Sequence, residues 1–354
     1  MGKIGFGTFQ ECKSLNAIDV SYGLSSIPSN CFDGCKSLRS VSLPNSIKVI
    51  SSGAFSYCEN LNAIALPLSL QSIFSGAFSG SGLTSIKIPH NVEVIGYSAF
   101  NTCKKLRSVE IPSNTKLKKI EKSVFEGCES IEELTIPECI DNIEEWAFGG
   151  CKSLKTIKLP SHIKKIENGL FRECVSLENV NNINNIISIG QEAFFRCRNL
   201  RSLTLPQQLS EIGHNSLCGV NINNINILSD YFEKDNFAIY TKGKKSLIEV
   251  LMVSPSWVIP EGVEEIKAWA FNGCRFAKMV IPNSVKELCN GAFVSCSIDR
   301  IEINTLLTVH PSTFSEGIKE IAVPKHLVEL YKKAVRNQNG YSLYDIDKKI
   351  TSLD

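Results

Sequence analysis

The chain has 354 residues, of which 43% are hydrophobic and 21% charged, as expected for a folded protein with a sizeable core. Its formal net charge is +2, from 38 basic and 36 acidic residues, so no charge excess favours nucleic acid or an acidic membrane surface. No stretch approaches the roughly 18 apolar residues of a membrane span. We therefore expect neither a nucleic-acid partner nor membrane insertion.

The N-terminal stretch, MGKIGFGTFQECKSL, lacks the charged and then apolar pattern of a signal peptide. Phe6 occupies the position where a myristoylation motif has Ser or Thr. The stretch matches the second half of a repeating unit whose strand half is missing, as in a fragment or an unusual first unit. These features predict either a cytoplasmic location or an export signal that this sequence does not include.

Residues 38–61, LRSVSLPNSIKVISSGAFSYCENL, form one copy of a unit that recurs about every 23 residues. Each copy contains a marker phenylalanine, and successive markers in the first series are 22 to 25 residues apart. A period in this range is the signature of a solenoid, in which stacked coils share a continuous core. The markers are Phe9, Phe32, Phe55, Phe78, Phe100, Phe125, Phe148, Phe171 and Phe194, followed after a gap by Phe271, Phe293 and Phe314.

Each unit begins with a segment whose apolar residues alternate, which predicts a short strand with one buried face. A proline follows the strand and ends it, because proline cannot donate a hydrogen bond to a neighbouring strand. Beyond the proline, Ile47 and Ile50 have the spacing of a helical turn or an extended bend. For Gly53-Ala54-Phe55 we predict a short helical turn whose phenylalanine fills the coil interior. The prolines are Pro44, Pro67, Pro89, Pro112, Pro137, Pro160, Pro206, Pro260, Pro282 and Pro324.

Ten of the 14 cysteines lie three residues after a marker phenylalanine, so they form one column along the stack. In-register side chains on neighbouring coils keep the sulfur atoms about 4.8 Å apart, too far for a disulfide bond. We predict buried free thiols that act as small hydrophobic residues. The chain has no CxxC motif that would indicate a zinc or redox site. The column is Cys12, Cys35, Cys58, Cys103, Cys128, Cys151, Cys174, Cys197, Cys274 and Cys296.

The repeat weakens at residues 178–187 and 221–227, which are rich in asparagine and which we interpret as degenerate coils. It is interrupted at residues 228–258, where two apolar segments flank TKGKK, the pattern of a hairpin with Gly243 in the turn. Aromatic residues gather in this segment. They predict either a binding site or a plug that covers the break in the core.

The repeat resumes at residue 259 and continues to residue 324. Residues 326–338, HLVELYKKAVRNQ, have the apolar spacing of an amphipathic helix that would cap the open end of the stack. We therefore divide one continuous solenoid domain into repeats at 1–227, a hairpin unit at 228–258, further repeats at 259–324 and a cap at 325–354.

The unit L-x-x-I-x-I-P-x-x-I-x-x-I-x-x-x-A-F-x-x-C resembles the BspA-like leucine-rich repeats of bacterial and protist surface proteins, over about residues 4–324. The hairpin segment and the C-terminal VPKHLVELYKKA are similar to units of that family. The resemblance implies an α/β leucine-rich-repeat solenoid, right-handed and curved. It places a parallel sheet on the concave face and short helical turns or irregular segments opposite. It also implies a cell-surface or secreted protein that binds host or matrix proteins.

Leucine-rich solenoids usually bind partners through the exposed positions of the concave sheet. Here these positions are small, polar and mixed in charge, and they lack the aromatic anchors typical of tight interfaces. They predict either a solvated sheet or a broad recognition surface of modest affinity, with Lys87 and Glu110, and Glu133 and Lys158, paired across coils. The candidate partner-binding residues are Ser40, Ser42, Ser85, Lys87, Ser108, Glu110, Glu133, Thr135, Thr156, Lys158, Asn179, Asn181, Ser202 and Thr204, with Tyr231, Phe232 and Tyr240 from the hairpin.

No G-x-S-x-G, H-E-x-x-H or phosphate-loop motif is present, and the five histidines lie in different coils. We therefore expect no catalytic residue, cofactor or metal. The sequence predicts a non-enzymatic, monomeric protein that binds a protein partner of unknown identity. The alternative is a cytoplasmic scaffold with no role in adhesion.

Overall fold

A computed structural model describes residues 4–20, 23–336 and 342–353. The chain divides into two compact units, Met1–Leu203 (unit 1) and Thr204–Asp354 (unit 2). Met1 and Gly2, where a myristoylation motif would begin, lie outside the described residues, as do residues 337 and 338 of the predicted 326–338 helix. The solenoid is confirmed, whereas the division at residues 227, 258 and 324 stays a prediction.

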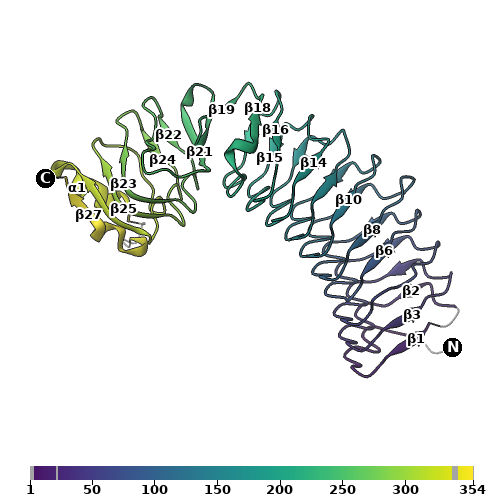
Figure 1. Ribbon diagram of the computed structural model, residues 1–354. Helices are drawn as coiled ribbons and strands as arrows, with labels where there is room; N and C mark the ends of the chain where they lie inside the picture. The colour runs from purple at the N-terminus through teal and green to yellow at the C-terminus, as the bar shows by residue number, and fades with distance from the viewer. Residues whose placement is uncertain (1–3, 21–22, 337–341, 354) are drawn as a thin grey trace. The chain divides into compact units, whose positions relative to one another are not determined.

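Unit 1 is a stack of coils, and Figure 1 shows the coils following one another from β1. Most coils begin with a three-residue strand, whereas the coil that starts at residue 61 has no strand there. Neighbouring strands pair in parallel and in register, as in Ser85↔Ser108 and Glu133↔Thr156. The alternation of apolar and polar letters buries the central side chain and exposes the outer two. The strands are β1 (Ala17–Asp19), β3 (Ser40–Ser42), β6 (Ser85–Lys87), β8 (Ser108–Glu110), β10 (Glu133–Thr135), β12 (Thr156–Lys158) and β14 (Asn179–Asn181).

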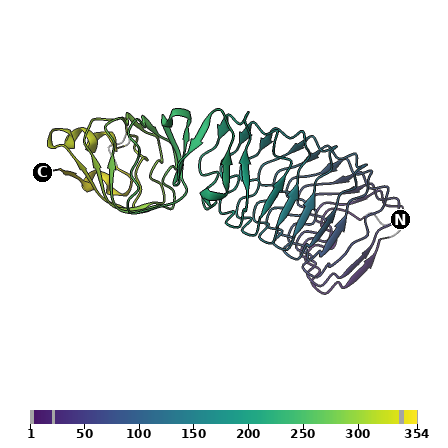
Figure 2. The ribbon, with the colours of Figure 1, turned by 45° about the horizontal axis from the view of Figure 1, so that its top comes forward.

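A second column of parallel strands, only two residues long, follows the three-residue strands (Figure 2), and in most coils the proline precedes it. The proline carbonyl accepts a hydrogen bond from the amide three residues later, as in Ile47 N to Pro44 O at 3.1 Å. The proline therefore ends one strand and opens a turn toward the next, so the Ile47 and Ile50 segment is an extended bend. The strands are β2 (Ser26–Ile27), β4 (Val49–Ile50), β5 (Ser72–Ile73), β7 (Val94–Ile95), β9 (Lys119–Ile120), β11 (Asn142–Ile143), β13 (Lys165–Ile166) and β15 (Ser188–Ile189).

The helical turn predicted around the marker phenylalanine is wrong for unit 1, where no described residue is helical. The residues two before and two after each marker have positive φ values, for example Gly53 at 64° and Tyr57 at 53° on either side of Phe55. Two left-handed residues so close together cannot belong to a right-handed helical turn. They fold the chain into successive tight turns and leave the marker pointing inward.

The core of unit 1 is built from repeated columns. The rings of the markers stack at 5.2–6.1 Å between centroids from Phe9 to Phe194. The cysteines are free thiols, as predicted, and all of the column except Cys12 is buried. They also bind the backbone: Cys151 Sγ donates to Phe125 O at 3.3 Å, and most of the column repeats this contact with the marker of the preceding coil. Desolvation on burial raises the pKa of Cys151 to about 12, so this thiol stays protonated.

Unit 2 contains the predicted hairpin. Strand β20 (Ala238–Thr241) pairs antiparallel with β21 (Ser246–Val250), and Gly243, at φ 72°, lies in the turn. Strand β19 (Phe232–Lys234) adds a third antiparallel strand on the other side of β20. Strand β21 then pairs in parallel with β22 (Glu265–Ile266), so the insertion re-enters the stack through its last strand. The other elements of this region are β16 (Leu203–Leu205), which begins at the last residue of unit 1, β17 (Glu211–Ile212), η1 (Ile222–Asn224), β18 (Ile225–Ile227) and η2 (Lys242–Lys244).

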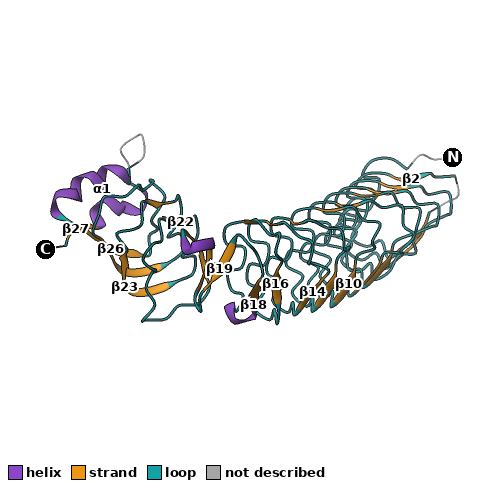
Figure 3. Ribbon diagram, turned by 90° about the horizontal axis from the view of Figure 1, so that it is seen from above, coloured by secondary structure: helices purple, strands orange, loops and turns teal. Residues whose placement is uncertain are grey.

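The C-terminal part of unit 2 has longer strands and ends in a cap (Figure 3). The predicted helix is α1 (Val328–Ala334), preceded by η3 (Lys325–Leu327). Buried Tyr331 on α1 donates a hydrogen bond to Thr305 O at 2.7 Å, which fixes the helix to the stack. The remaining elements are β23 (Arg275–Ile281), β24 (Glu287–Leu288), β25 (Ser297–Ile303), β26 (Ile318–Val323), η4 (Leu343–Lys349) and β27 (Ile350–Ser352).

Candidate binding surfaces

The outward residues of the three-residue strands, together with Ser202 just before β16, form the surface that we call the strand face. It comprises Ser40, Ser42, Ser85, Lys87, Ser108, Glu110, Glu133, Thr135, Thr156, Lys158, Asn179, Asn181 and Ser202. All are exposed except Thr156, which is half-buried. Thr204, the next predicted residue, is half-buried in β16, in unit 2. The structure thus brings the predicted residues of unit 1 onto one surface with no aromatic side chain among them.

One of the two predicted ion pairs forms. Lys87 Nζ lies 2.7 Å from a carboxylate oxygen of Glu110 on the neighbouring strand. Glu133 instead lies beside Thr156, and Lys158 beside Thr135, because the strands pair in register and place the two charges on diagonal positions. Both partners of the Lys87–Glu110 pair are more than half exposed, so solvent screening limits it to about 0–1 kcal/mol.

The hairpin aromatics are mostly core residues. Tyr240 is fully buried and donates a hydrogen bond to Asp235 Oδ2 at 2.8 Å, and Phe232 is 6% exposed. Neither ring can reach a partner, so the plug interpretation fits these two residues better than the binding one. Tyr231 is 54% exposed and remains a candidate contact residue.

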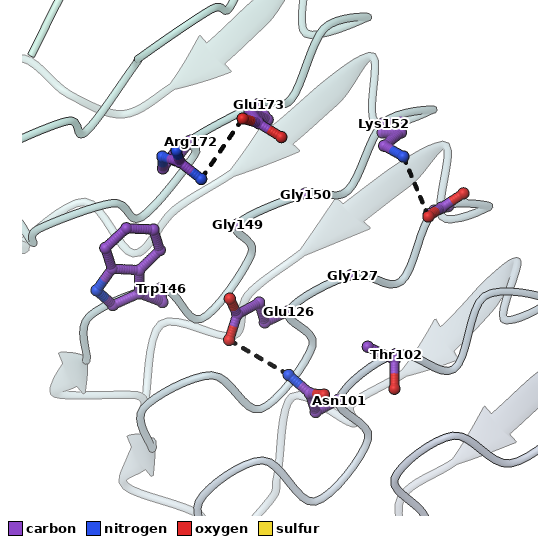
Figure 4. A pocket seen from close by; sticks show the side chains of 11 residues that line it. Asn101, Thr102, Glu126, Gly127, Trp146, Gly149, Gly150, Lys152, Arg172 and Glu173 are labelled. Carbon is purple, nitrogen blue, oxygen red and sulfur yellow. Dashed lines mark hydrogen bonds and ion pairs between the residues drawn. The ribbon is translucent and has the colours of Figure 1, made fainter. Parts of the chain in front are cut away.

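A pocket that the sequence analysis missed lies on the turns of unit 1, away from the strand positions (Figure 4). It has a volume of about 300 Å³. Trp146, Glu126 and Arg172 form its walls, and Gly127, Gly149 and Gly150 form its floor. We call it the turn pocket. Two features of the sequence could have indicated this pocket. Glycines occupy turn positions in two neighbouring units, and they lie close to Trp146, the only tryptophan of unit 1.

Trp146 stands two residues before its marker, in the left-handed region at φ 61°. This conformation is uncommon for a bulky residue and costs of the order of 1–2 kcal/mol. The next coil has Gly169 at the same position, and its absent side chain gives the indole room. A Cβ atom on Gly169 would lie 2.6 Å from the indole. The indole of Trp146 therefore lies over the neighbouring coil, with its ring against Gly169.

The pocket carries three carboxylates and two cations, and most of them are already paired. Glu129 lies 3.1 Å from Lys152 and 3.5 Å from Lys104, and the hydrogen bond from Lys152 lowers the pKa of Glu129. Glu173 lies 3.5 Å from Arg172 and 3.4 Å from Arg196. These contacts leave Glu126 as the carboxylate of the pocket with no ion pair to any described residue.

A buried carboxyl group occurs in unit 2. Glu249, on β21, is 2% exposed and accepts a hydrogen bond from Leu217 N at 3.1 Å, while its Oε1 has no partner among the described residues. Desolvation raises its pKa to about 8 against the ordinary 4.5. The carboxyl is buried and hydrogen-bonded to the backbone, so we assign it a structural role.

Among the residues that the structure describes, no group of three or more His, Cys, Asp or Glu side chains is arranged to hold a metal ion. Within the same residues, no helix has the length and apolar character needed to cross a bilayer.

The fold defines a leucine-rich-repeat solenoid: columns of short parallel strands in register, with a repeated apolar core. The chain belongs to the BspA-type leucine-rich repeat family, whose model matches residues 2–119, 118–242 and 254–354. This confirms the resemblance inferred from the repeat unit.

Solved structures with similar folds come from bacterial leucine-rich repeat proteins. A leucine-rich cell surface protein from Faecalibacterium prausnitzii is 24% identical, with a TM-score of 0.58 over 80% of this chain and 83% of that one. A leucine-rich repeat protein from Bacteroides ovatus is 21% identical, with a TM-score of 0.47 over 99% and 88% of the two chains. A search among curated proteins gives no significant match.

Proposed function

We propose that the protein is a non-enzymatic binding module of the cell surface that recognises a protein partner through the strand face. The main support is the strand face itself, a row of exposed polar side chains held in register by parallel strands. Solenoids of this kind present extended surfaces to partners instead of enclosing a reaction site. Their backbones are rigid, so the positions of such side chains are fixed before the partner arrives.

The composition of the strand face favours modest affinity. Serine, threonine and asparagine can donate and accept hydrogen bonds, but they bury little apolar area. Tight interfaces usually depend on a few aromatic or arginine residues, which this row lacks. We infer that binding is spread over several coils of unit 1, and Tyr231 of the hairpin is a separate candidate contact residue in unit 2. The cell-surface location is supported by the similar fold of the leucine-rich cell surface protein from Faecalibacterium prausnitzii.

The test introduces three charges on the strand face, as Ser85→Lys, Ser108→Lys and Thr156→Lys together. Binding to a panel of purified host extracellular-matrix proteins is measured by surface plasmon resonance. A matched control carries the same three charges at His90, Ser113 and Asn114, which are exposed turn residues outside the strands. We expect the strand-face variant to weaken binding at least about tenfold, because like charges or unpaired charges at an interface cost several kcal/mol. Equal binding by both variants would exclude the strand face as the contact surface.

A further inference from the structure

The turn pocket lies on a ladder of alternating aromatic and cationic side chains. Arg172 Cζ is 5.5 Å from the centroid of Trp146 and 5.1 Å from that of Phe195. Arg196 Cζ follows at 4.9 Å from Phe195. Trp146, Arg172 and Phe195 come from three successive coils, and Arg196 follows Phe195 within the same coil. Each guanidinium lies over an aromatic ring at a distance typical of cation–π attraction.

Trp146 is the last residue of this ladder. Glu126 lies on the side of Trp146 where another cation would continue the alternation. Backbone hydrogen bonds order the coils: Gly127 N donates to Gly149 O at 2.7 Å, and Gly150 N donates to Arg172 O at 2.6 Å. Glu126, Gly149 and Arg172 are therefore equivalent residues of three successive coils. Figure 4 shows Glu126 and Arg172 on opposite sides of Gly149, with Trp146 beside them. Arg172 occupies one side of the indole, and the pocket opens on the side of Glu126.

The carboxylate of Glu126 favours a cation on that side. Glu126 accepts one hydrogen bond, from Asn101 Nδ2 to its Oε2 at 3.2 Å, and forms no ion pair with a described residue. The two other carboxylates of the pocket are each shared between two cations. The pocket therefore combines a partly exposed indole with one carboxylate that forms no ion pair with a described residue. The three glycines of the floor keep the space between these two groups free of side chains.

We propose that the turn pocket binds an arginine side chain of the protein partner, with the guanidinium stacked on Trp146 and hydrogen-bonded to Glu126. Arginine fits better than lysine because its planar guanidinium can stack on an indole and donate two parallel hydrogen bonds to one carboxylate. A volume of about 300 Å³ is at the small end of ligand sites and suits a single side chain. An anionic ligand would face Glu126 and would find Lys152 and Arg172 already paired with Glu129 and Glu173. This inference rests on the proposed protein-binding function and adds a second contact to it.

The experiment uses the full chain labelled with 5-fluorotryptophan, in which the three tryptophans give separate fluorine NMR signals. The signal of Trp146 is assigned with Trp146→Phe. The probe is N-acetyl-arginine amide, and N-acetyl-citrulline amide serves as its neutral analogue of nearly equal shape. We expect arginine to shift the Trp146 signal saturably, and to leave Trp257 and Trp269 unchanged. Citrulline should bind at least about fivefold more weakly, because it lacks the charge.

Two matched variants test which carboxylate of the pocket binds the guanidinium. Glu126→Gln should weaken arginine binding about fivefold, whereas Glu129→Gln should change it less than about twofold because Lys104 and Lys152 already compensate that carboxylate. Trp146 belongs to unit 1 with both substituted residues, so an unchanged urea midpoint of its signal in the absence of ligand shows that each variant is folded. The proposal is overturned if Trp146 does not respond, if citrulline binds as tightly as arginine, if Glu126→Gln has no effect, or if a methyl glycoside saturates the signal instead. Because the probe is a small molecule, any of these results leaves the strand-face proposal standing, and failure of the strand-face test leaves this one standing.

Discussion

Units 1 and 2 differ in how they accommodate buried polar groups. In unit 1 the repeat applies one solution in coil after coil, since most thiols of the cysteine column donate to the marker carbonyl of the preceding coil. In unit 2 the inserted hairpin buries Glu249, whose Oε1 finds no partner among the described residues. A regular stack can repeat the same hydrogen bond to the backbone in each coil. An insertion that interrupts the stack needs its own contacts, which occur at that position alone.

The three tryptophans allow each unit to be followed separately, because Trp146 belongs to unit 1 and Trp257 and Trp269 belong to unit 2. Urea unfolding monitored by the fluorine signals of the labelled protein therefore reports the stability of each unit. The changes below are ordered from the largest expected effect to the smallest.

Glu249→Gln should change the pH dependence of unit 2. The folded-state pKa of about 8 lies above the ordinary 4.5, so the folded state holds a proton that the unfolded state releases between these values. Stability of the wild type should fall as pH rises from about 5 to 9, by at most about 5 kcal/mol. The glutamine variant should be nearly independent of pH and more stable than wild type at pH 9. Urea midpoints from the Trp257 and Trp269 signals check this, and parallel pH curves for both proteins would contradict the buried carboxyl.

Phe125→Ala should destabilise unit 1 by about 4 kcal/mol, because the removed ring packs between Phe100 and Phe148 and leaves a cavity. Phe9→Ala is the matched control: this ring is half-buried and has a neighbour on one side only, so about 1–2 kcal/mol should be lost. Unfolding is followed by the Trp146 signal, with unit 2 expected to be unchanged. Equal losses at the two positions would show that the stack contributes nothing beyond burial of a single ring.

Gly169→Ala should destabilise unit 1 by about 2 kcal/mol and displace the indole of Trp146. The new Cβ would meet the indole at 2.6 Å, in addition to the cost of a side chain at φ 61°. Gly76→Ala separates the two effects, since Gly76 has nearly the same φ, 64°, and nothing within 4 Å of the added atom. That control should cost about 1 kcal/mol and leave the Trp146 signal in place. If both variants behave alike, contact with Gly169 does not position the indole.

The sequence was sufficient for features that repeat in register. The period places Ser85 beside Ser108 and Lys87 beside Glu110, and the cysteine column followed from the same alignment of units. The hairpin turn was predictable because Gly243 lies between two apolar segments. Such features depend on the alignment of neighbouring coils, and this alignment follows directly from the repeats in the sequence.

Other features could not be found in this way. The left-handed turns were missed because residues as different as Tyr57, Trp146 and Glu173 occupy positions that a glycine pattern would have revealed. The burial of Tyr240 depends on how one hairpin packs against its own unit, which no repeat determines. The turn pocket exists because Gly127, Gly149 and Gly150 have no side chains to fill it. That these glycines lie together becomes apparent only when the coils are stacked in the structure.

The thiol column has a consequence for how such a chain can change in length. A contact such as that between Cys151 Sγ and Phe125 O joins one coil only to the coil before it. If one whole unit of about 23 residues were duplicated or deleted, each thiol would still meet a marker carbonyl, and each ring would still meet a ring. The interior sets no preferred number of coils. Gene duplication could therefore lengthen or shorten the surface offered to partners while every core contact keeps its geometry.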